Sequence, residues 1–186
     1  MTVSPIYTTA PTQGLAQEQK AVFAALERLA IPFERVEHEY ANTMEDCKAV
    51  SAVLGVDVCK NLVLCNRQKT QYYLLTMPSD KPFHTKDLSH QIGSARLSFA
   101  SAEAMEELLR TPPGSASILS LLFDKEHRVQ LVMDRETKDC DHFSCHPCKS
   151  TGTLKLRTSD VLGVFLPYTG HEPLVVDLPR YEEDRA

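Results

Sequence analysis

The pattern of apolar and polar positions alternates between helical and strand periods along the chain. From 16 to 30, apolar side chains such as Val22 and Leu26 recur at helical spacing while charged ones face away, which predicts a helix that ends before Pro32. The next stretch, 33–40, alternates polar and apolar residues and is typical of a strand. The chain is therefore expected to begin its fold with a helix followed by a strand.

Four further stretches carry helix signals. Thr43 can cap a helix over 44–54, two acidic residues stand in its first turn, and Gly55 can end it. The other predicted helices are 86–91 after a cap at Thr85, 102–110 after a cap at Ser101, and 160–170.

Apolar runs of strand length, separated by turn residues, account for much of the remaining chain. Residues 60–65 and 71–77 flank a polar turn and predict a hairpin, and 118–123 and 128–134 predict a second one. Because hairpins and helices are mixed without strict alternation, the pattern predicts an α/β fold of the α+β type, with a mixed, mostly antiparallel sheet and helices packed on it. The other predicted strands are 96–101, 151–157 and 172–178.

The length of 186 residues favours a single domain. We place it at 16–178, between a flexible lead at 1–15 and a polar tail at 179–186. Hydrophobic residues make up 42% and charged residues 24%, which is typical of a soluble globular protein. No apolar run reaches the ~18 residues of a membrane span, and the first residues lack the basic and apolar regions of a secretory signal. We therefore expect a cytoplasmic protein without a membrane partner.

The charge and the cysteines narrow the range of partners. A net charge of −5 argues against a protein that binds nucleic acid over a large surface, because such proteins usually carry a basic stripe. We expect no DNA partner, whereas a small local patch can still hold one end of an RNA. Six cysteines in a chain without an export signal suggest a reducing compartment and free thiols.

The densest group of chemically reactive side chains is the segment CDHFSCHPC at 140–148. Cys145 and Cys148 form one close pair, and Cys140 with His142 could form another, so a zinc site is one interpretation, although zinc-finger pairs usually stand further apart. A redox pair is a second interpretation, although Cys145 and Cys148 lie before a strand and not at the start of a helix. In the third interpretation the cysteines are small side chains without a shared task.

Seven segments share their order and spacing with a known family: KNLVL (60–64), RLSFAS (96–101), PGSAS (113–117), LLFDKEHRVQLVMD (121–134), HP (146–147), TGTLKL (151–156) and TGHEPLVVDL (169–178). Together they resemble the prolyl-tRNA editing domain family, free-standing aminoacyl-tRNA deacylases related to the editing insertion of bacterial prolyl-tRNA synthetases. The resemblance covers about 16–178, and the ordered set is specific although each segment alone is weak. It is closest to the stand-alone proteins that hydrolyse Ala-tRNA(Pro).

The resemblance implies a twisted mixed sheet that is curled into a partial barrel and flanked by helices. It also implies a reaction, hydrolysis of the ester that joins an amino acid, above all alanine, to tRNA(Pro), without a metal or other cofactor. The implied partners are the 3′ end of the aminoacyl-tRNA and prolyl-tRNA synthetase. The implied catalytic positions are Lys60, Gly114 and His146. Around them we expect further substrate-binding positions at Asn61, Arg96, Ser98, Ser115, Ser117, Ser150 and Thr151.

Each catalytic position suits a step of ester hydrolysis. The ammonium of Lys60 can hold the terminal phosphate or ribose as a compact point charge. Gly114 lets the backbone approach the ester closely. His146 can position the substrate or a water first and act as a general base second, because its ordinary pKa of ~6.5 permits acid–base chemistry.

The sequence departs from the family pattern at two places beside the expected pocket. Ile118 stands where the family usually has proline, and the segment CKSTGT alters the positions of Ser150 and Gly152. These differences bear on which amino acid is removed more than on the reaction. Two other classes of function stay open: a metal- or thiol-based regulatory binding module at 140–148, and an inactive relative that binds tRNA or a synthetase.

Overall fold

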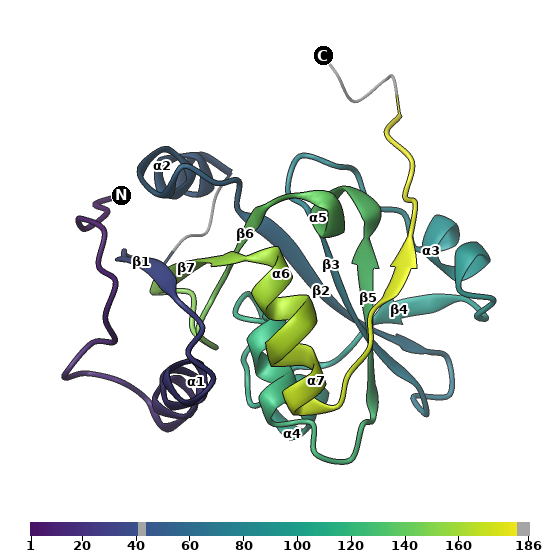
Figure 1. Ribbon diagram of the computed structural model, residues 1–186. Coiled ribbons are helices and arrows are strands. Elements are labelled where there is room, and N and C mark those ends of the chain that lie inside the picture. Colours follow the sequence, from purple (N-terminus) through teal and green to yellow (C-terminus); the bar gives the residue numbers. More distant parts are fainter. Residues whose placement is uncertain (41–43, 182–186) are drawn as a thin grey trace.

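Two β-sheets form the centre of the protein, and the computed structural model describes residues 1–40 and 44–181 (Figure 1). The five-stranded sheet has the order β4-β2-β3-β5-β8, and the three-stranded sheet has the order β1-β7-β6. A parallel bridge between Val58 and Ser144 joins the two sheets. The strands are β1 (Phe33–Glu37), β2 (Cys59–Asn66), β3 (Tyr72–Pro78), β4 (Leu97–Phe99), β5 (Val129–Asp134), β6 (His142–Cys145), β7 (Gly152–Arg157) and β8 (Leu174–Val176).

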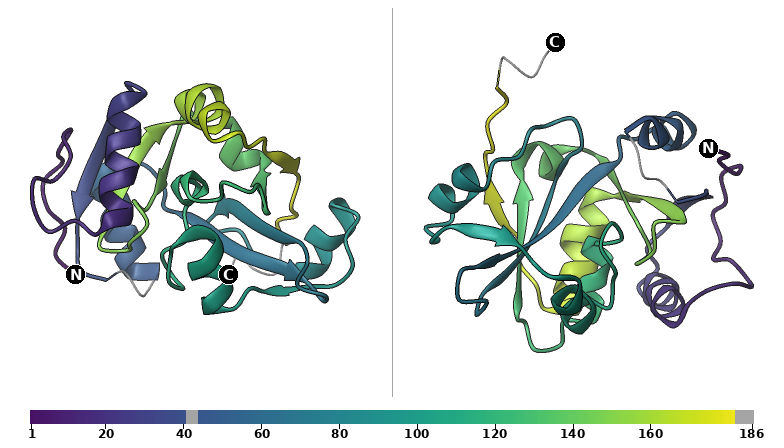
Figure 2. Two further views of the ribbon diagram at one scale, coloured as in Figure 1. Left: turned by 90° about the horizontal axis from the view of Figure 1, so that it is seen from below. Right: turned by 180° about the vertical axis from the view of Figure 1, so that it is seen from behind.

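Antiparallel pairs predominate among the described strands, as the sequence pattern predicts. β2 pairs antiparallel with β3 and β4, and β7 pairs antiparallel with β1 and β6. The pairs that β5 makes with β3 and β8 are parallel. Within the described ranges the two sheets lie side by side and do not close into a barrel (Figure 2).

Helices cover both faces of the larger sheet, so side chains on both faces are buried. Leu74 packs in the main core with residues of α1, α4 and the smaller sheet, whereas its neighbour Leu75 packs in a second core with Leu88 of α3. This alternation follows from the two-residue period of a strand. The helices are α1 (Gln17–Arg28), α2 (Met44–Leu54), α3 (Thr85–Gln91), α4 (Ala102–Leu109), α5 (Arg135–Asp139), α6 (Thr158–Asp160) and α7 (Leu166–Thr169), with a 3₁₀ segment η1 (Ile118–Leu122) and a π segment η2 (Val161–Phe165).

The second predicted hairpin is wrong in its first strand. Residues 118–122 form η1, in which all five side chains are buried, and β5 pairs with β3 and β8 instead. The Ser117 hydroxyl accepts a hydrogen bond from Leu119 N and starts this turn. A short, continuously apolar run does not distinguish a buried strand from a buried helical segment, because neither exposes a polar face.

The predicted helices are confirmed with adjusted ends. The Ser101 hydroxyl caps α4 by accepting from Ala104 N at 3.2 Å, as predicted. Thr85 is the first residue of α3 and not its cap, which is His84, and the predicted cap at Thr43 lies outside the described residues. The predicted helix 160–170 is divided into α6, η2 and α7. None of the helices in the described part of the chain combines the length and apolar character needed to cross a membrane.

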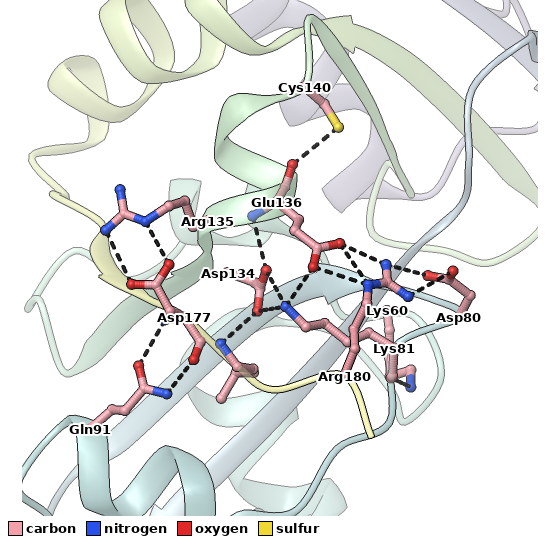
Figure 3. Close-up of polar contacts among 11 residues, drawn as sticks. Lys60, Asp80, Lys81, Gln91, Asp134, Arg135, Glu136, Cys140, Asp177 and Arg180 are labelled. Atoms are coloured by element: carbon pink, nitrogen blue, oxygen red, sulfur yellow. Dashed lines mark hydrogen bonds and ion pairs between the residues drawn. The ribbon is translucent and has the colours of Figure 1, made fainter. Parts of the chain in front are cut away.

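Both ends of the described chain contact the fold. In the predicted flexible lead, Val3 and Tyr7 form bridges with His38 and Arg35 beside β1. In the predicted polar tail, the guanidinium of Arg180 bonds Asp80 and Glu136 (Figure 3). These contacts tie the segments before and after the sheets to the same body.

Candidate functional site

Two loops that are distant in sequence meet beside the end of β1. The Ser115 hydroxyl accepts a hydrogen bond from Ser150 N at 3.2 Å, and it lies 3.3 Å from the hydroxyl of Tyr40. Ser115 and Ser150 are each 1% exposed, whereas Tyr40 is 45% exposed. The loop that contains Gly114, the loop that follows His146 and the end of β1 therefore form one continuous surface.

His146 lies where β6 ends and the second loop begins. Its Nδ1 is 2.9 Å from Gly152 O, and because a carbonyl only accepts, Nδ1 carries the proton. Within the described residues no side chain or backbone group bonds Nε2. The neutral ring therefore presents the lone pair of Nε2, which can accept a proton or a hydrogen bond.

The surroundings of His146 favour its neutral form. Burial lowers the pKa of His146, the hydrogen bond to Gly152 O opposes this effect, and the neighbouring His38 lowers the pKa further. The two imidazole rings stand edge to face with centroids 6.3 Å apart. His146 is therefore uncharged near neutral pH, as a hydrogen-bond acceptor or general base must be.

Several other predicted residues lie in the two loops. Gly114 has a left-handed backbone with φ of 81°, and a Cβ built there meets nothing within 4 Å, so the turn and not crowding requires glycine. Ser117 is fully buried beneath the loop, and its hydroxyl starts η1. Thr151 is exposed at the tip of the second loop. These placements put Gly114, Ser115, Ser117, Ser150, Thr151 and His146 in one region.

Lys60 points away from this region. Its Nζ donates to Lys81 O at 2.7 Å, on the face of β2 that carries the second core (Figure 3). Asn61 has the opposite orientation, since its Oδ1 accepts from the Thr76 hydroxyl at 2.8 Å on the other face. Desolvation lowers the pKa of Lys60, and the nearby Asp80 partly opposes this. The structure thus brings Gly114 and His146 into neighbouring loops and leaves the ammonium of Lys60 on the other side of the sheet.

Arg96 and Ser98 are also separate from the loops. Both are exposed beside or on β4, and Ser98 pairs with Cys65 near the end of β2. The bridge to β6 lies at the other end of β2, at Val58. At ~3.3 Å per strand residue, Cys65 and Val58 stand about 23 Å apart.

The cysteines of 140–148 do not share a site. The segment contains β6, which the sequence did not predict, and the pairing of β6 with β7 sends neighbouring side chains to opposite faces. Cys140 is exposed and its thiol donates to Glu136 O, whereas Cys145 and Cys148 are buried in the main core. Burial raises the pKa of the Cys148 thiol to about 12 and raises the pKa of Cys145 as well.

The described structure therefore gives no geometric support to the zinc or redox interpretation. Within 1–40 and 44–181, no three His, Cys, Asp or Glu side chains are grouped closely enough to hold a metal ion. A protonated, buried thiol is a poor nucleophile and a poor metal ligand, because both roles need the thiolate.

Three residues of the site were not predicted from the sequence: His38, Tyr40 and Thr153. His38 Nε2 lies 2.8 Å from the Thr153 hydroxyl, across 115 positions of sequence. In the sequence, His38 and Tyr40 alternate with glutamates and share the face of apolar Val36, and this pattern does not distinguish a site residue from a core residue. The sequence signal that could have indicated these residues is a histidine and a tyrosine at the end of a predicted strand.

Open space borders the second loop. A hollow of about 360 Å³ is lined by His38, Pro147 and 151–154, among other residues. A larger hollow of about 960 Å³ lies at the opposite ends of β3 and β5, and none of the predicted site residues lines it. A Cβ at Gly152, where the loop joins β7, would lie 3.3 Å from Val36 O, which is a tight contact.

Comparison with known proteins gives the class of this fold and site. Residues 38–164 match the family model of the aminoacyl-tRNA editing domain. The prolyl-tRNA synthetase associated domain-containing protein 1 of Mus musculus is 34% identical over 153 residues, which cover 80% of this chain and 89% of the mouse protein. The prolyl-tRNA editing protein ProX of Acetoanaerobium sticklandii is 30% identical over 144 residues, which cover 77% of this chain and 87% of that protein.

The fold is shared with a solved structure as well. A crystal structure of a proposed trans-editing enzyme for prolyl tRNA synthetase superposes with a TM-score of 0.66 at 16% identity, over 90% of this chain and all of that one. The chain belongs to the aminoacyl-tRNA editing domain family. The resemblance read from the ordered sequence motifs is thereby confirmed.

Proposed function

We propose that this protein is a trans-editing deacylase that hydrolyses the ester of mischarged tRNA(Pro), with Ala-tRNA(Pro) as its main substrate. The observation that carries the proposal is the meeting of the Gly114–Ser117 loop with the loop after His146, inside the region that matches the editing-domain family. The names of the mouse and bacterial relatives support prolyl-tRNA as the substrate class and prolyl-tRNA synthetase as a partner.

The proposed reaction is the attack of one water on the ester carbonyl carbon. The water gives a proton to Nε2 of neutral His146, or to a hydroxyl of the tRNA that releases its own proton at the same time. The C–O ester bond breaks, and the ribose oxygen leaves with the proton that the histidine or the hydroxyl passes on. Backbone N–H groups of the Gly114 turn can approach the developing oxyanion, because Gly114 has no side chain in the way. The products are a free amino acid and an uncharged tRNA.

Lys60 is proposed as a cation that contacts the tRNA on the other face of the sheet, and not as a member of the loop cluster. Its ammonium donates to a backbone carbonyl, and this partner does not cancel its charge. The hydrogen bond that this charged group makes has a net value of about 1.5–3 kcal/mol, and a phosphate contact would replace it with an ion pair. The four-carbon stem of lysine lets the ammonium reach a tRNA phosphate that passes β2.

A panel of charged tRNAs tests the proposed function. The protein should release alanine from tRNA(Pro) faster than proline, by about 10–200-fold if the pocket discriminates by size. Alanine, serine, cysteine, threonine and proline on tRNA(Pro) are incubated with the protein, and the remaining ester is measured over time. Release from none of the five esters would end the deacylase proposal.

Lys60→Ala separates an enzyme from an inactive relative that only binds. An enzyme should lose part of its deacylation rate in this variant, with a higher KM for the charged tRNA. A protein that only binds has no rate to lose, and only its affinity for uncharged tRNA should fall. Zinc that remains at stoichiometric level after dialysis would favour the regulatory module instead.

As the pH falls, the deacylation rate should decrease only below the ordinary pKa of histidine. The pKa of His146 is lowered from its usual ~6.5, so Nε2 stays unprotonated until the pH falls through this lower value. The pKa is lowered because burial favours the neutral ring in the native state. The check is the rate of alanine release against pH, corrected for spontaneous ester hydrolysis. An acid limb centred at or above pH ~6.5 would contradict the assignment of His146 as the group that titrates.

A further inference from the structure

The hydrogen bonds around His146 continue to a second histidine. The Thr153 hydroxyl lies 3.4 Å from His146 Nδ1 and 2.8 Å from His38 Nε2. On its other side, His38 Nδ1 lies 2.7 Å from Glu39 O. Thr153 and His38 are 1% and 8% exposed, and both line the hollow beside the second loop.

The donors in this chain can be assigned from its two ends. Glu39 O accepts only, so His38 Nδ1 carries the proton of the neutral ring and Nε2 carries a lone pair. The Thr153 hydroxyl therefore donates its hydrogen to His38 Nε2. Its oxygen then turns a lone pair toward His146 Nδ1, whose proton is already directed at Gly152 O.

We propose that His38 is a positioning residue for the editing reaction: through Thr153 it holds His146 in the Nδ1–H tautomer, with Nε2 left for the water or the substrate. This inference rests on the proposed function and deepens it. If His38 did not take the hydroxyl hydrogen, the Thr153 hydroxyl could turn and donate to His146 Nδ1. That arrangement would favour the opposite tautomer, in which Nε2 carries the proton and cannot accept one.

The pair of strands that carries the network explains how it is held. His38 directly follows β1, Thr153 is the second residue of β7, and the two strands pair in register from Phe33 with Leu156 to Glu37 with Gly152. His38 N also donates to Thr151 O at 3.1 Å. The backbone ladder thus sets the separation of the two side chains, and the network needs no movement to form.

Variants of Thr153 and His38 test the inference on deacylation kinetics. Thr153→Val and His38→Leu should each lower kcat for Ala-tRNA(Pro) roughly 10- to 100-fold, with KM changed less than about 3-fold, because the base is misoriented while binding is kept. Thr153→Ser keeps the hydroxyl and should restore kcat, and His38→Gln keeps an acceptor and should restore part of it. The matched control is Thr158→Val, since Thr158 directly follows β7, is 3% exposed, and has no described partner for its hydroxyl.

Nitrogen-15 NMR of the histidine side chains gives a readout that needs neither substrate nor turnover. In the wild-type protein at neutral pH, His146 should show a protonated Nδ1 and an unprotonated Nε2, and His38→Leu should increase the population with Nε2–H. A wild-type His146 with Nε2 protonated would overturn the inference, as would a Thr153→Val variant as active as Thr158→Val. If the wild-type protein releases no amino acid from any tRNA, the proposed function fails, while the NMR result still decides whether the network holds the tautomer.

Discussion

Replacing Lys81 by methionine should lower the free energy of unfolding by about 3–5 kcal/mol, because the change leaves a buried carboxylate without its cation. Lys81 is 2% exposed, and its Nζ lies 3.0 and 2.9 Å from the two carboxylate oxygens of Asp134, which is fully buried. A second bond of 3.1 Å reaches Glu136 (Figure 3). Urea or thermal unfolding measures the loss, with about 2–4 °C of Tm for each kcal/mol in a chain of this size.

The geometry explains why the effect is large. Asp134 also accepts hydrogen bonds from Glu136 N and Leu178 N, at 3.0 and 3.2 Å, so it connects β5, α5 and the segment after β8. Removing the ammonium leaves the carboxylate of Asp134 charged and without its cation, in a place where water does not solvate it. The free energy of unfolding should therefore fall because Asp134 loses its cation. The packing of the lysine stem should change little, because methionine keeps an unbranched apolar side chain there.

Two further variants make this prediction specific. Lys81→Met combined with Asp134→Asn should recover more than half of the loss, because asparagine keeps an acceptor for Glu136 N and removes the charge. Arg135→Ala breaks an ion pair with Asp177 in which both side chains are half exposed or more, and it should leave Tm nearly unchanged. A Lys81→Met protein as stable as Arg135→Ala, or a double variant no better than the single one, would show that the buried pair does not hold this part of the fold.

The elements that the sequence predicted well are those whose signals are local. The β2–β3 hairpin has two apolar runs of strand length around a polar turn, and the Ser101 cap needs only three neighbouring residues. The first strand of the second hairpin failed for the opposite reason. Every residue of 118–122 is apolar or small and buried, so the segment carries no period that separates a strand from a helical turn.

The site could be predicted in part, because the ordered motifs of the family place Gly114, Ser115 and His146 near one another. The direction of each side chain could not be predicted. Lys60 and Asn61 are neighbours in one strand, so they must face opposite sides, and the sequence does not show which side faces the loops. His38 and Thr153 were missed because their contact spans 115 positions and depends on the register of β1 against β7.

Replacing His146 by asparagine should lower kcat for Ala-tRNA(Pro) by about 10²–10⁴-fold, the range for loss of a positioned acid or base. Asparagine can keep a donor for Gly152 O, so the loop should remain folded while the acceptor at Nε2 disappears. Because the buried ring is neutral, the loss should be present throughout neutral and alkaline pH, and the acid limb of the rate profile should vanish with the histidine.

The matched control for this substitution is His142→Asn. His142 lies four positions earlier, as the first residue of β6, and its side chain is exposed. It belongs to the Cys140–Cys148 cluster that the metal hypothesis uses, and it has no part in the proposed hydrolysis. If deacylation falls equally in both variants, the activity depends on the integrity of β6 or on a metal held there. If it falls only in His146→Asn, the imidazole itself participates, since the two changes delete the same group only four positions apart.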